Sequence, residues 1–203
     1  MRRAIMVDVD GVLIRHPASA GWSADLERDL GVSITALQEG FFAPHWQDVV
    51  CGRAALRDRL KPVLAHIAPA VSADALIDYW FRNDAHLDWH LLTELDGIRR
   101  SGIEVHLATV QEHERARYLW DELALRDHFD GMHYAAALGS AKPALEFYRA
   151  IEDRTGLTAN QIFFIDDWHE NVAAAHACGW LAAVWSGGQS VVELMAREQR
   201  CER

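Results

Sequence analysis

The chain has 203 residues, 50% of them hydrophobic and 25% charged, which is the balance of one large globular domain or of one domain with a smaller insert. A net charge of −10 with histidine neutral argues against a nucleic acid or an anionic membrane as partner, because Lys and Arg bind those surfaces. No apolar run approaches a membrane span, and no N-terminal segment resembles a signal peptide. We therefore expect a cytoplasmic protein.

Two residue types are scarce. The three cysteines, Cys51, Cys178 and Cys201, are few and widely spaced, which predicts reduced thiols rather than a disulfide framework or a zinc site. The chain contains only two lysines, Lys61 and Lys142. A lysine in this chain is therefore a candidate for a specific role.

The first predicted element is a buried strand over residues 4–9, "AIMVDV". The roughly 80 residues that follow are almost wholly helical in pattern, with helices expected at 23–31, 54–67 and 72–89. Pro62 is expected to kink or split the second of these helices. This part of the sequence predicts a helical insert after the first strand.

From residue 90 onward, strands and helices alternate. Further strands are expected at 103–110, 131–136, 161–167 and 181–186. Helices are expected at 90–102, at 111–125, from Pro143 in a first turn to about Thr155, and at 171–179. The alternation predicts right-handed βαβ units, and thus an α/β fold with a doubly wound parallel sheet that carries the helical insert.

Polar residues gather where the predicted strands end, at the edge where such sheets bind ligands. These strand-end residues are Asp8, Asp10, Thr109, Asp166 and Asp167. One lysine, Lys142 in "GSAKP" (139–143), is expected to join them. Carboxylates this close together stay ionised only beside a cation, and an all-oxygen set suits Mg²⁺. Because Lys142 and Thr109 suit phosphoryl oxygens, the set predicts phosphoryl transfer.

Four motifs, in this order, resemble those of the haloacid dehalogenase (HAD) superfamily of phosphohydrolases. "DVDGV" resembles the first, Asp-x-Asp-Gly-[Thr/Val], and "HLATV" resembles the second, a strand that ends in Ser or Thr. "LGSAKPALEFY" resembles the third, and "FFIDDWHENVAAAHACG" resembles the fourth. The pattern is most similar to the branch typified by α-D-glucose-1-phosphate phosphatase. The resemblance implies a HAD-type Rossmannoid core at 1–13 and 91–203 and a subclass I helical cap at 14–90.

The resemblance also implies an activity, that of a Mg²⁺-dependent phosphatase acting on a small phosphorylated metabolite, a sugar phosphate by its branch. Asp8 would be the nucleophile that forms an aspartyl-phosphate. Asp10 would protonate the leaving group and then deprotonate the attacking water.

The remaining motif residues would bind the metal and the phosphoryl group. By the resemblance, Mg²⁺ would be held by the Asp8 carboxylate, the Asp10 backbone carbonyl and Asp167, with Asp166 acting directly or through a water. Thr109 and Lys142 would hold the phosphoryl group. Two positions depart from the family pattern: Val110 stands where Asn is frequent, and Trp168 beside the acidic pair is expected to narrow the site.

The insert carries candidates for contact with the organic part of the substrate. Aromatic side chains suit a sugar ring and an arginine suits a charge, and the candidates are Trp22, Phe42, Trp46 and Arg53. The alternative for each is ordinary packing in the core of the cap.

Other functions stay open at this stage. A 2-haloacid dehalogenase needs neither a metal nor a second motif-one acid, so Asp10 and the acidic pair count against it. A phosphomutase would use the same site. A phosphoacceptor signalling module would have the acidic pair first and the phosphorylated Asp later, the reverse of the order here. The chain is expected to be a monomer or a homodimer.

Overall fold

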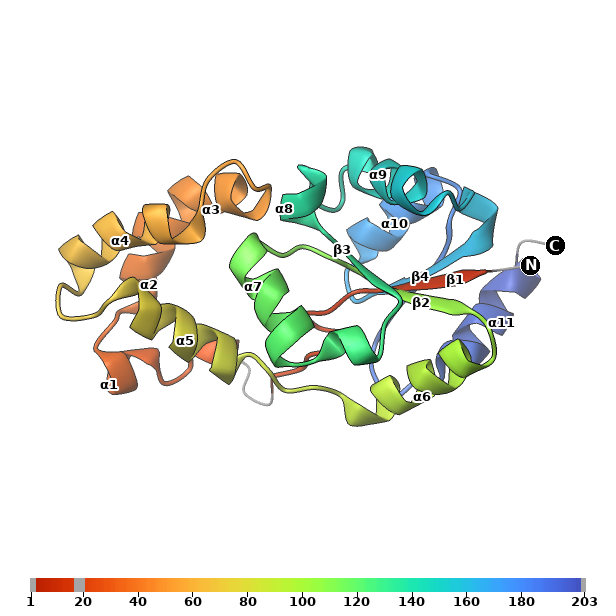
Figure 1. Ribbon diagram of the computed structural model, residues 1–203, viewed down its shortest axis with the longest axis horizontal. Coiled ribbons are helices and arrows are strands. Elements are labelled where there is room, and N and C mark those ends of the chain that lie inside the picture. Colours follow the sequence, from red (N-terminus) through yellow and green to blue (C-terminus); the bar gives the residue numbers. More distant parts are fainter. Residues whose placement is uncertain (1–2, 17–20, 202–203) are drawn as a thin grey trace.

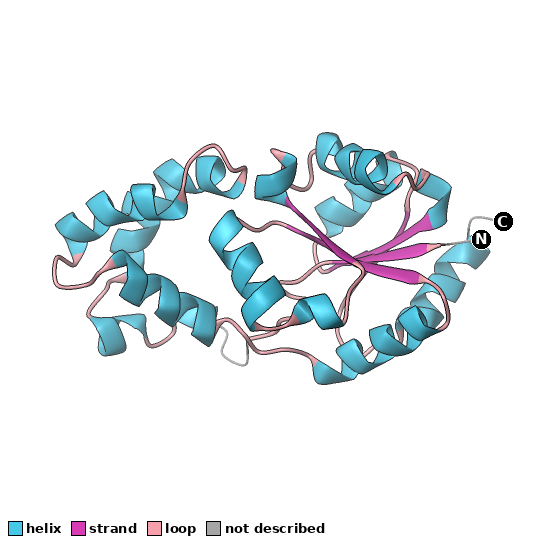
Figure 2. Cartoon of the chain, in the orientation of Figure 1, coloured by secondary structure: helices cyan, strands magenta, loops and turns pink. Residues whose placement is uncertain are grey.

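The computed structural model describes residues 3–16 and 21–201, and a five-stranded parallel sheet lies at its centre (Figures 1 and 2). The strands are β1 (Ala4–Val7), β2 (Glu104–Thr109), β3 (Gly131–Tyr134), β4 (Ile162–Asp166) and β5 (Leu181–Val184), in the spatial order β3-β2-β1-β4-β5. The chain builds outward from β1 to β3 on one side and then crosses to β4 and β5 on the other. The predicted doubly wound sheet is confirmed, and its order reverses between β1 and β4, where such sheets open a crevice.

Alternate residues of β1 enter different hydrophobic cores, as the two-residue period of a strand requires. Ile5 and Val7 pack with α6 (Trp89–Arg100) and α11 (Val191–Cys201). Ala4 and Met6 pack with α9 (Leu145–Thr155) and α10 (His169–Ala177) on the opposite face. With both faces covered, the open edge at the carboxyl ends of the strands is left for ligands.

Several elements are shorter than their predictions, and two of these differences bear on the site. The first strand ends at Val7 rather than at residue 9, so both motif-one aspartates lie on a loop. The helix predicted at 111–125 consists of α7 (His113–Arg117) and the π-helical turn η3 (Tyr118–Glu122), which leaves residues 111 and 112 outside it. Ala124, in the left-handed region at φ 54°, follows η3 and precedes the short helix η4 (Leu125–Asp127).

Pro143 lies before a helix and not in its first turn, which corrects the prediction. The helix α9 begins at Leu145, and Pro143 lies in a turn in which the Ala144 N–H donates to the Ala141 carbonyl at 3.0 Å. The strand predicted at 131–136 ends at Tyr134, where α8 (Ala135–Leu138) begins. The short helix η5 (Ala159–Gln161) precedes β4.

The insert is a helical unit with a hydrophobic core of its own, contributed by residues from Leu26 to Phe81. Its elements are η1 (Gly21–Ser23), α1 (Leu26–Leu30), α2 (Ile34–Leu37), η2 (Gln38–Phe42), α3 (Ala43–Val50), α4 (Leu56–Ile67) and α5 (Ala73–Asn83). The helix α4 is not split by Pro62, which lies on its exposed side, where water can solvate the carbonyl that loses its partner.

The chain leaves and re-enters the sheet domain through two paired segments. The Arg15 N–H donates to the His86 carbonyl at 3.1 Å, and the Asp88 N–H donates to the Leu13 carbonyl at 2.8 Å. These paired segments lie near residues 14 and 90, the expected limits of the cap, which stay a prediction. Figure 1 shows the cap helices at one end of the molecule, beyond the carboxyl ends of the strands.

A buried arginine joins the cap to the sheet domain. Arg115 of α7 is 2% exposed, and its guanidinium donates to the Phe81 carbonyl at 2.9 Å and to the carbonyl of Asp84, just after α5. Arg57 of α4 pairs with Glu114 of α7 at 2.7 Å. These contacts place the cap relative to the start of α7, which directly follows the second motif.

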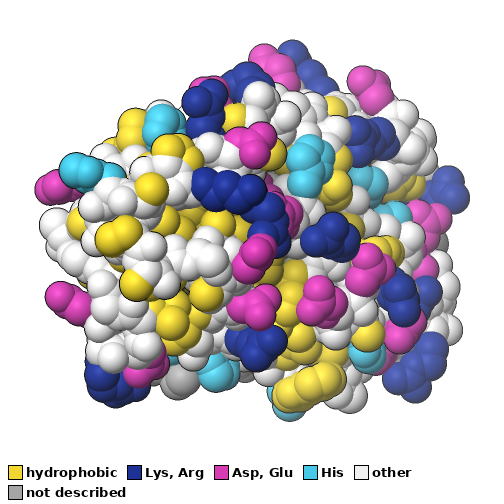
Figure 3. All heavy atoms as spheres, turned by 60° about the vertical axis from the view of Figure 1, so that its left-hand side comes forward, with side chains coloured by type: hydrophobic (Ala, Val, Ile, Leu, Met, Phe, Trp, Pro, Cys, Tyr) yellow, Lys and Arg dark blue, Asp and Glu magenta, His cyan; other side chains and the backbone are white. Residues whose placement is uncertain are grey.

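Charged side chains of both signs intermingle on the face drawn in Figure 3, with hydrophobic side chains in small groups among them. Cys51 and Cys178 are free thiols. Among the described residues, no helix combines the length and the apolar composition that a membrane crossing requires.

His133 on β3 is expected to make the stability of the protein depend on pH. Burial lowers the pKa of His133 to about 4, with further contributions from His106, whose ring is 5.3 Å away, and Arg154. As pH falls below about 6.5, His133 becomes protonated in the unfolded chain but stays neutral in the folded chain. The free energy of unfolding therefore decreases as pH falls from 6.5 to 4. We expect roughly 3 kcal/mol of loss from this group by pH 4, of which about 2 kcal/mol should already be lost at pH 5.

The measurement is urea unfolding at pH 7 and at pH 5 for the wild type and for His133→Gln, which removes the titrating group. The other ionisable groups are common to both proteins, so the difference between the two pH dependences isolates His133. Equal pH dependences would contradict the assignment.

Candidate active site

Three of the predicted site residues meet in one buried cluster. Asp8 follows β1, Asp166 ends β4, and Lys142 reaches both from the turn before α9. The Lys142 Nζ lies 2.8 Å from the Asp8 Oδ1 and 2.5 Å from the Asp166 Oδ2, and it donates to the Ala108 carbonyl at 3.1 Å. Only 1% of the Lys142 side chain is exposed. The scarce lysine therefore has a specific position at the carboxyl edge of the sheet.

The two acids of the fourth motif differ in their environment. Asp166 is fully buried, and its Oδ1 accepts from the Trp168 N–H at 2.8 Å and from the Asn171 Nδ2 at 2.9 Å. Its Oδ2 is bound by Lys142, so both oxygens of Asp166 have partners. The buried Oδ1 of Asp167, in contrast, has no hydrogen-bond partner among the described residues. Asp167 therefore has an oxygen free for a ligand.

The acids outnumber the base in this cluster. Asp8, Asp166 and Asp167 each offer an oxygen, all within 4.8 Å of one another, against one lysine. Burial raises the pKa of Asp8 to about 7, although Lys142 opposes the rise. Burial and the Asp166 charge raise the pKa of Asp167. A further positive charge would stabilise this cluster, and its oxygen donors fit a hard divalent ion such as Mg²⁺.

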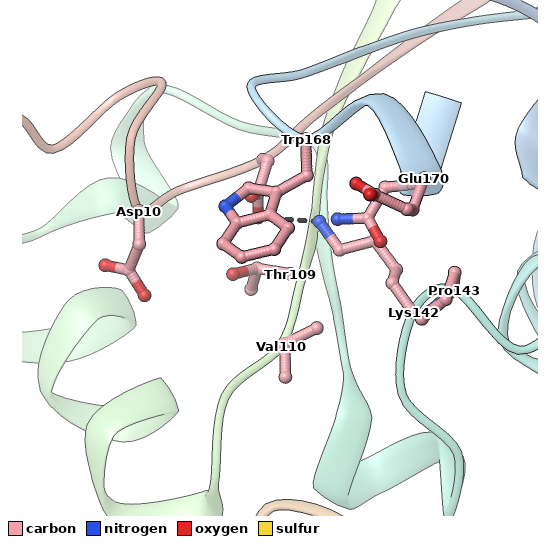
Figure 4. A pocket seen from close by; sticks show the side chains of 9 residues that line it. Asp10, Thr109, Val110, Lys142, Pro143, Trp168 and Glu170 are labelled. Carbon is pink, nitrogen blue, oxygen red and sulfur yellow. Dashed lines mark ion pairs between the residues drawn. The ribbon is translucent and has the colours of Figure 1, made fainter. Parts of the chain in front are cut away.

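The cluster opens into a cavity of about 480 Å³. The residues that line it are Asp8, Asp10, Thr109, Val110, Lys142, Pro143, Trp168, Glu170 and Asn171. Thr109 is 1% exposed at the end of β2, whereas Trp168 is 63% exposed at the mouth. Figure 4 shows the Asp10 carboxylate on the opposite side of the Trp168 indole from Lys142. The side chain of Asp10 thus faces the cavity apart from the Lys142 cluster.

Two residues near the site, Gln111 and Glu170, were not among the predicted site residues. Gln111 donates from its Nε2 to the Asp10 Oδ2 at 2.6 Å, and Glu170 lines the cavity. The one signal in the sequence is proximity, because Gln111 comes two residues after Thr109 and Glu170 three residues after Asp167.

The four cap candidates do not line this cavity. Trp22 stacks on Trp80 with ring centroids 5.0 Å apart, and Phe42 packs against Trp46 at 5.5 Å. Arg53 is exposed, and its guanidinium is bound to the Asp48 carboxylate at 2.8 Å and to the Gln47 carbonyl at 3.1 Å. The three aromatic side chains are half-buried in the cap, so their contact with a substrate stays a prediction.

Gly11 has to be glycine for Asp167 to occupy its position. Its φ is +82°, and a Cβ there would lie 2.1 Å from the Asp167 Oδ2. Gly11→Ala is expected to displace Asp167 and to weaken Mg²⁺ binding at least about tenfold, besides roughly 1–2 kcal/mol of backbone strain.

Calorimetric titration with Mg²⁺ measures this effect, and Gly156→Ala is the matched control. Gly156 has a similar φ of +68° with nothing within 4 Å of its Cβ position, so its substitution adds strain without touching the site. Equal Mg²⁺ affinity in the two variants would show that Asp167 does not bind the metal.

Three comparisons relate the chain to known proteins. A family model described as haloacid dehalogenase-like hydrolase matches residues 2–179. A sesquiterpene phosphatase of Aspergillus oryzae is 35% identical over 104 residues, which are 48% of this chain and 48% of that protein, so the match spans about half of the relative's length.

Solved structures share the fold. A HAD family enzyme from Bacteroides thetaiotaomicron, complexed with magnesium and inorganic phosphate, superposes with a TM-score of 0.81 at 16% identity, over 96% of this chain and 99% of that one. An L-2-haloacid dehalogenase from Xanthobacter autotrophicus superposes with a TM-score of 0.63 at 20% identity, over 100% of this chain and 84% of that one. At these identities the likeness concerns the fold.

Proposed function

The chain belongs to the haloacid dehalogenase-like hydrolases, and from this premise we propose that it is a Mg²⁺-dependent phosphatase acting through an aspartyl-phosphate on Asp8. The observation that carries the proposal is the buried Lys142, which lies between two aspartates and lines an open cavity. Beside this cluster, Asp167 has an oxygen that none of the described residues hydrogen-bonds. Such a site neutralises and positions a phosphate ester, which is most of what phosphoryl transfer requires.

Each side chain has a defined role in the proposed reaction. A carboxylate oxygen of Asp8 attacks the phosphorus, and the bond from phosphorus to the leaving oxygen breaks. Asp10 gives its proton to that oxygen and then takes a proton from the water that hydrolyses the aspartyl-phosphate. Lys142, in the turn before α9, and Thr109, at the end of β2, bind phosphoryl oxygens.

The oxygen donors of this site suit Mg²⁺, which would be held by the Asp8 and Asp167 carboxylates and by the Asp10 backbone carbonyl. When bound, the ion would neutralise charge on the phosphate. Asp166 differs from Asp167 because its oxygens are already bound by Lys142, the Trp168 N–H and Asn171. We therefore propose that Asp166 orients Lys142 and that Asp167 binds the metal directly.

We further propose a monophosphate of a small neutral alcohol, a sugar phosphate, as the substrate. Of the described residues that line the cavity, Lys142 is the only cationic one, and Asp8 and Asp166 already engage it. A second phosphate would therefore find no free cationic partner among these residues. Val110, Pro143 and Trp168 offer apolar surface for one face of a ring. The name of the fungal relative makes a terpenoid monophosphate the competing substrate class.

Dehalogenation and phosphate transfer within one metabolite are the competing activities on this fold. The dehalogenase reaction gives no task to Asp10 or to the free oxygen of Asp167, and both are present. A mutase would show itself by an isomeric phosphate ester as product in place of free phosphate.

The test is a panel of hexose, pentose and terpenoid monophosphates, a sugar bisphosphate and a 2-haloacid, each incubated with Mg²⁺ and with EDTA. We expect phosphate release only with Mg²⁺, with a sugar monophosphate preferred over the bisphosphate and no halide release. Preference for the terpenoid ester would overturn the sugar proposal alone. Metal-independent halide release without phosphatase activity would overturn the phosphatase proposal.

The cap prediction is tested on the same panel with Trp46→Ala and Arg53→Ala. If either side chain contacts the substrate, the order of preference among the esters changes. An unchanged order would leave both residues with a purely structural role.

A further inference from the structure

Gln111 lies directly behind a proposed catalytic group without facing the cavity itself. It is 4% exposed and is not among the residues that line the cavity. Its Nε2 donates to the Asp10 Oδ2 at 2.6 Å and lies 3.4 Å from the Thr109 Oγ1. Gln111 therefore contacts two site residues from the protein side.

The backbone around Gln111 is fixed on both sides. Its carbonyl accepts from the Ala136 N–H at 3.1 Å, which ties it to the start of α8. The next residue, Glu112, caps α7 by accepting from the Glu114 and Arg115 N–H groups. Three positions further on, Arg115 is buried and bound to the carbonyls of Phe81 and Asp84. The amide of Gln111 is thus presented from a rigid segment.

Asp10, in contrast, is an exposed residue on the loop after β1, outside the Lys142 cluster. A carboxyl group in such a position can rotate, and a proton donor that rotates away from the leaving oxygen is lost to the reaction. Misplacement of a reacting group by about 1 Å can lower a rate on the order of 100-fold. A donor held at 2.6 Å from one carboxyl oxygen restrains that rotation.

We propose that Gln111 is a positioning residue for proton transfer, which holds the Oδ2 of Asp10 so that Oδ1 is the oxygen that exchanges protons in the cavity. This inference rests on the proposed phosphatase function. Because Oδ2 accepts the amide N–H, the proton that Asp10 donates resides on Oδ1. It passes to the leaving oxygen as the bond from that oxygen to phosphorus breaks. In the second step water attacks phosphorus, the bond to Asp8 breaks, and a proton of the water returns to Oδ1.

The dependence on the leaving group distinguishes positioning from a general structural role. An alkyl phosphate needs protonation of its leaving oxygen, whereas a nitrophenyl phosphate has a leaving group that departs without it. The variant Gln111→Met preserves length and removes the donor. We expect kcat/KM for the alkyl ester to fall about 100-fold and kcat/KM for the nitrophenyl ester to change less than about threefold.

A second signature comes from the nitrophenyl ester alone. Its kcat/KM reports formation of the aspartyl-phosphate, but its kcat includes hydrolysis, for which Asp10 must accept a proton from water. Gln111→Met should therefore lower kcat for this ester well beyond its effect on kcat/KM. The melting temperature and the Mg²⁺ affinity, measured in parallel, should stay close to those of the wild type.

The outcomes separate this inference from the proposed function. Equal losses on both esters, or no loss on either, would overturn the positioning role while the phosphatase function stands. A wild type that releases phosphate from neither ester would overturn both. Should Gln111→Met fail to fold, Gln111→Asn supports the same comparison, because its amide is one methylene too short to reach Asp10, and the same leaving-group-dependent loss is expected.

Discussion

Asp8→Asn is expected to abolish phosphate release, with a loss of at least about 1,000-fold, because an amide cannot attack phosphorus. The protein should nevertheless become more stable in the absence of Mg²⁺. Burial raises the pKa of Asp8 to about 7, so its native pKa lies above the unfolded value of 3.8. The native state then holds a proton that the unfolded chain releases, and stability is lost as pH rises from about 4 to 7. Asparagine does not titrate, so the variant does not lose this stability as pH rises.

At pH 8 without Mg²⁺ we expect Asp8→Asn to exceed the wild type in stability by roughly 2–4 kcal/mol. Urea unfolding at pH 8 and at pH 4 measures the difference, which should vanish at the lower pH. Asp58→Asn, an exposed substitution on the cap helix α4, is the control and should change neither activity nor stability. A variant of Asp8 that keeps more than a tenth of the activity would contradict its role as nucleophile.

Lys142→Met is expected to damage both stability and activity. The ammonium group offsets the charges of Asp8 and Asp166, and its removal leaves two buried carboxylates without their partner. Breaking a buried ion pair in this way costs about 3–5 kcal/mol. Loss of one preorganised positive charge at the phosphoryl group is expected to lower kcat about 100- to 1,000-fold.

The matched control is Lys61→Met, which removes the only other lysine of the chain from an exposed position on α4. Unfolding curves with and without Mg²⁺ measure the effect, and Mg²⁺ should restore part of the stability of Lys142→Met because it opposes the same carboxylate charges. If the two lysine variants unfold at the same urea concentration, Lys142 does not neutralise the cluster.

The meeting of Asp8, Lys142 and Asp166 followed from the sequence because parallel strands present their carboxyl ends at one edge of a sheet. That inference needed only the apolar runs at 4–9 and 161–167, each with an aspartate near its end, and Lys142, one of two lysines, before a predicted helix. The details that position Lys142 were not accessible in the same way. The helix α9 begins two residues later than Pro143 suggested, and a turn places the lysine instead of the first turn of the helix.

The sequence did not predict the hydrogen bonds between residues that are close in space but not in sequence. Asp166 and Asp167 are adjacent and identical in type. Both oxygens of Asp166 are bound, whereas one oxygen of Asp167 has no partner within the described part of the chain. Gln111 was included in the helix predicted at 111–125, whereas the observed helix α7 begins two residues later, at His113. Its contact with Asp10 therefore had no signal in the sequence. In the cap, aromatic composition fits a hydrophobic core and a substrate surface equally. The structure packs Trp22 and Trp46 against Trp80, and Phe42 against Trp46.

In the proposed reaction, Asp8 carries the phosphoryl group during turnover. The most direct measurement is to quench the enzyme with acid while it hydrolyses its best substrate, to reduce it with borohydride, and to analyse its peptides by mass spectrometry. A phosphorylated aspartate is reduced to homoserine, so we expect homoserine at position 8 in samples quenched during turnover and unmodified Asp8 in samples without substrate. Steady phosphate release with Asp8 unmodified, or with the modification at another residue, would show that Asp8 is not the nucleophile.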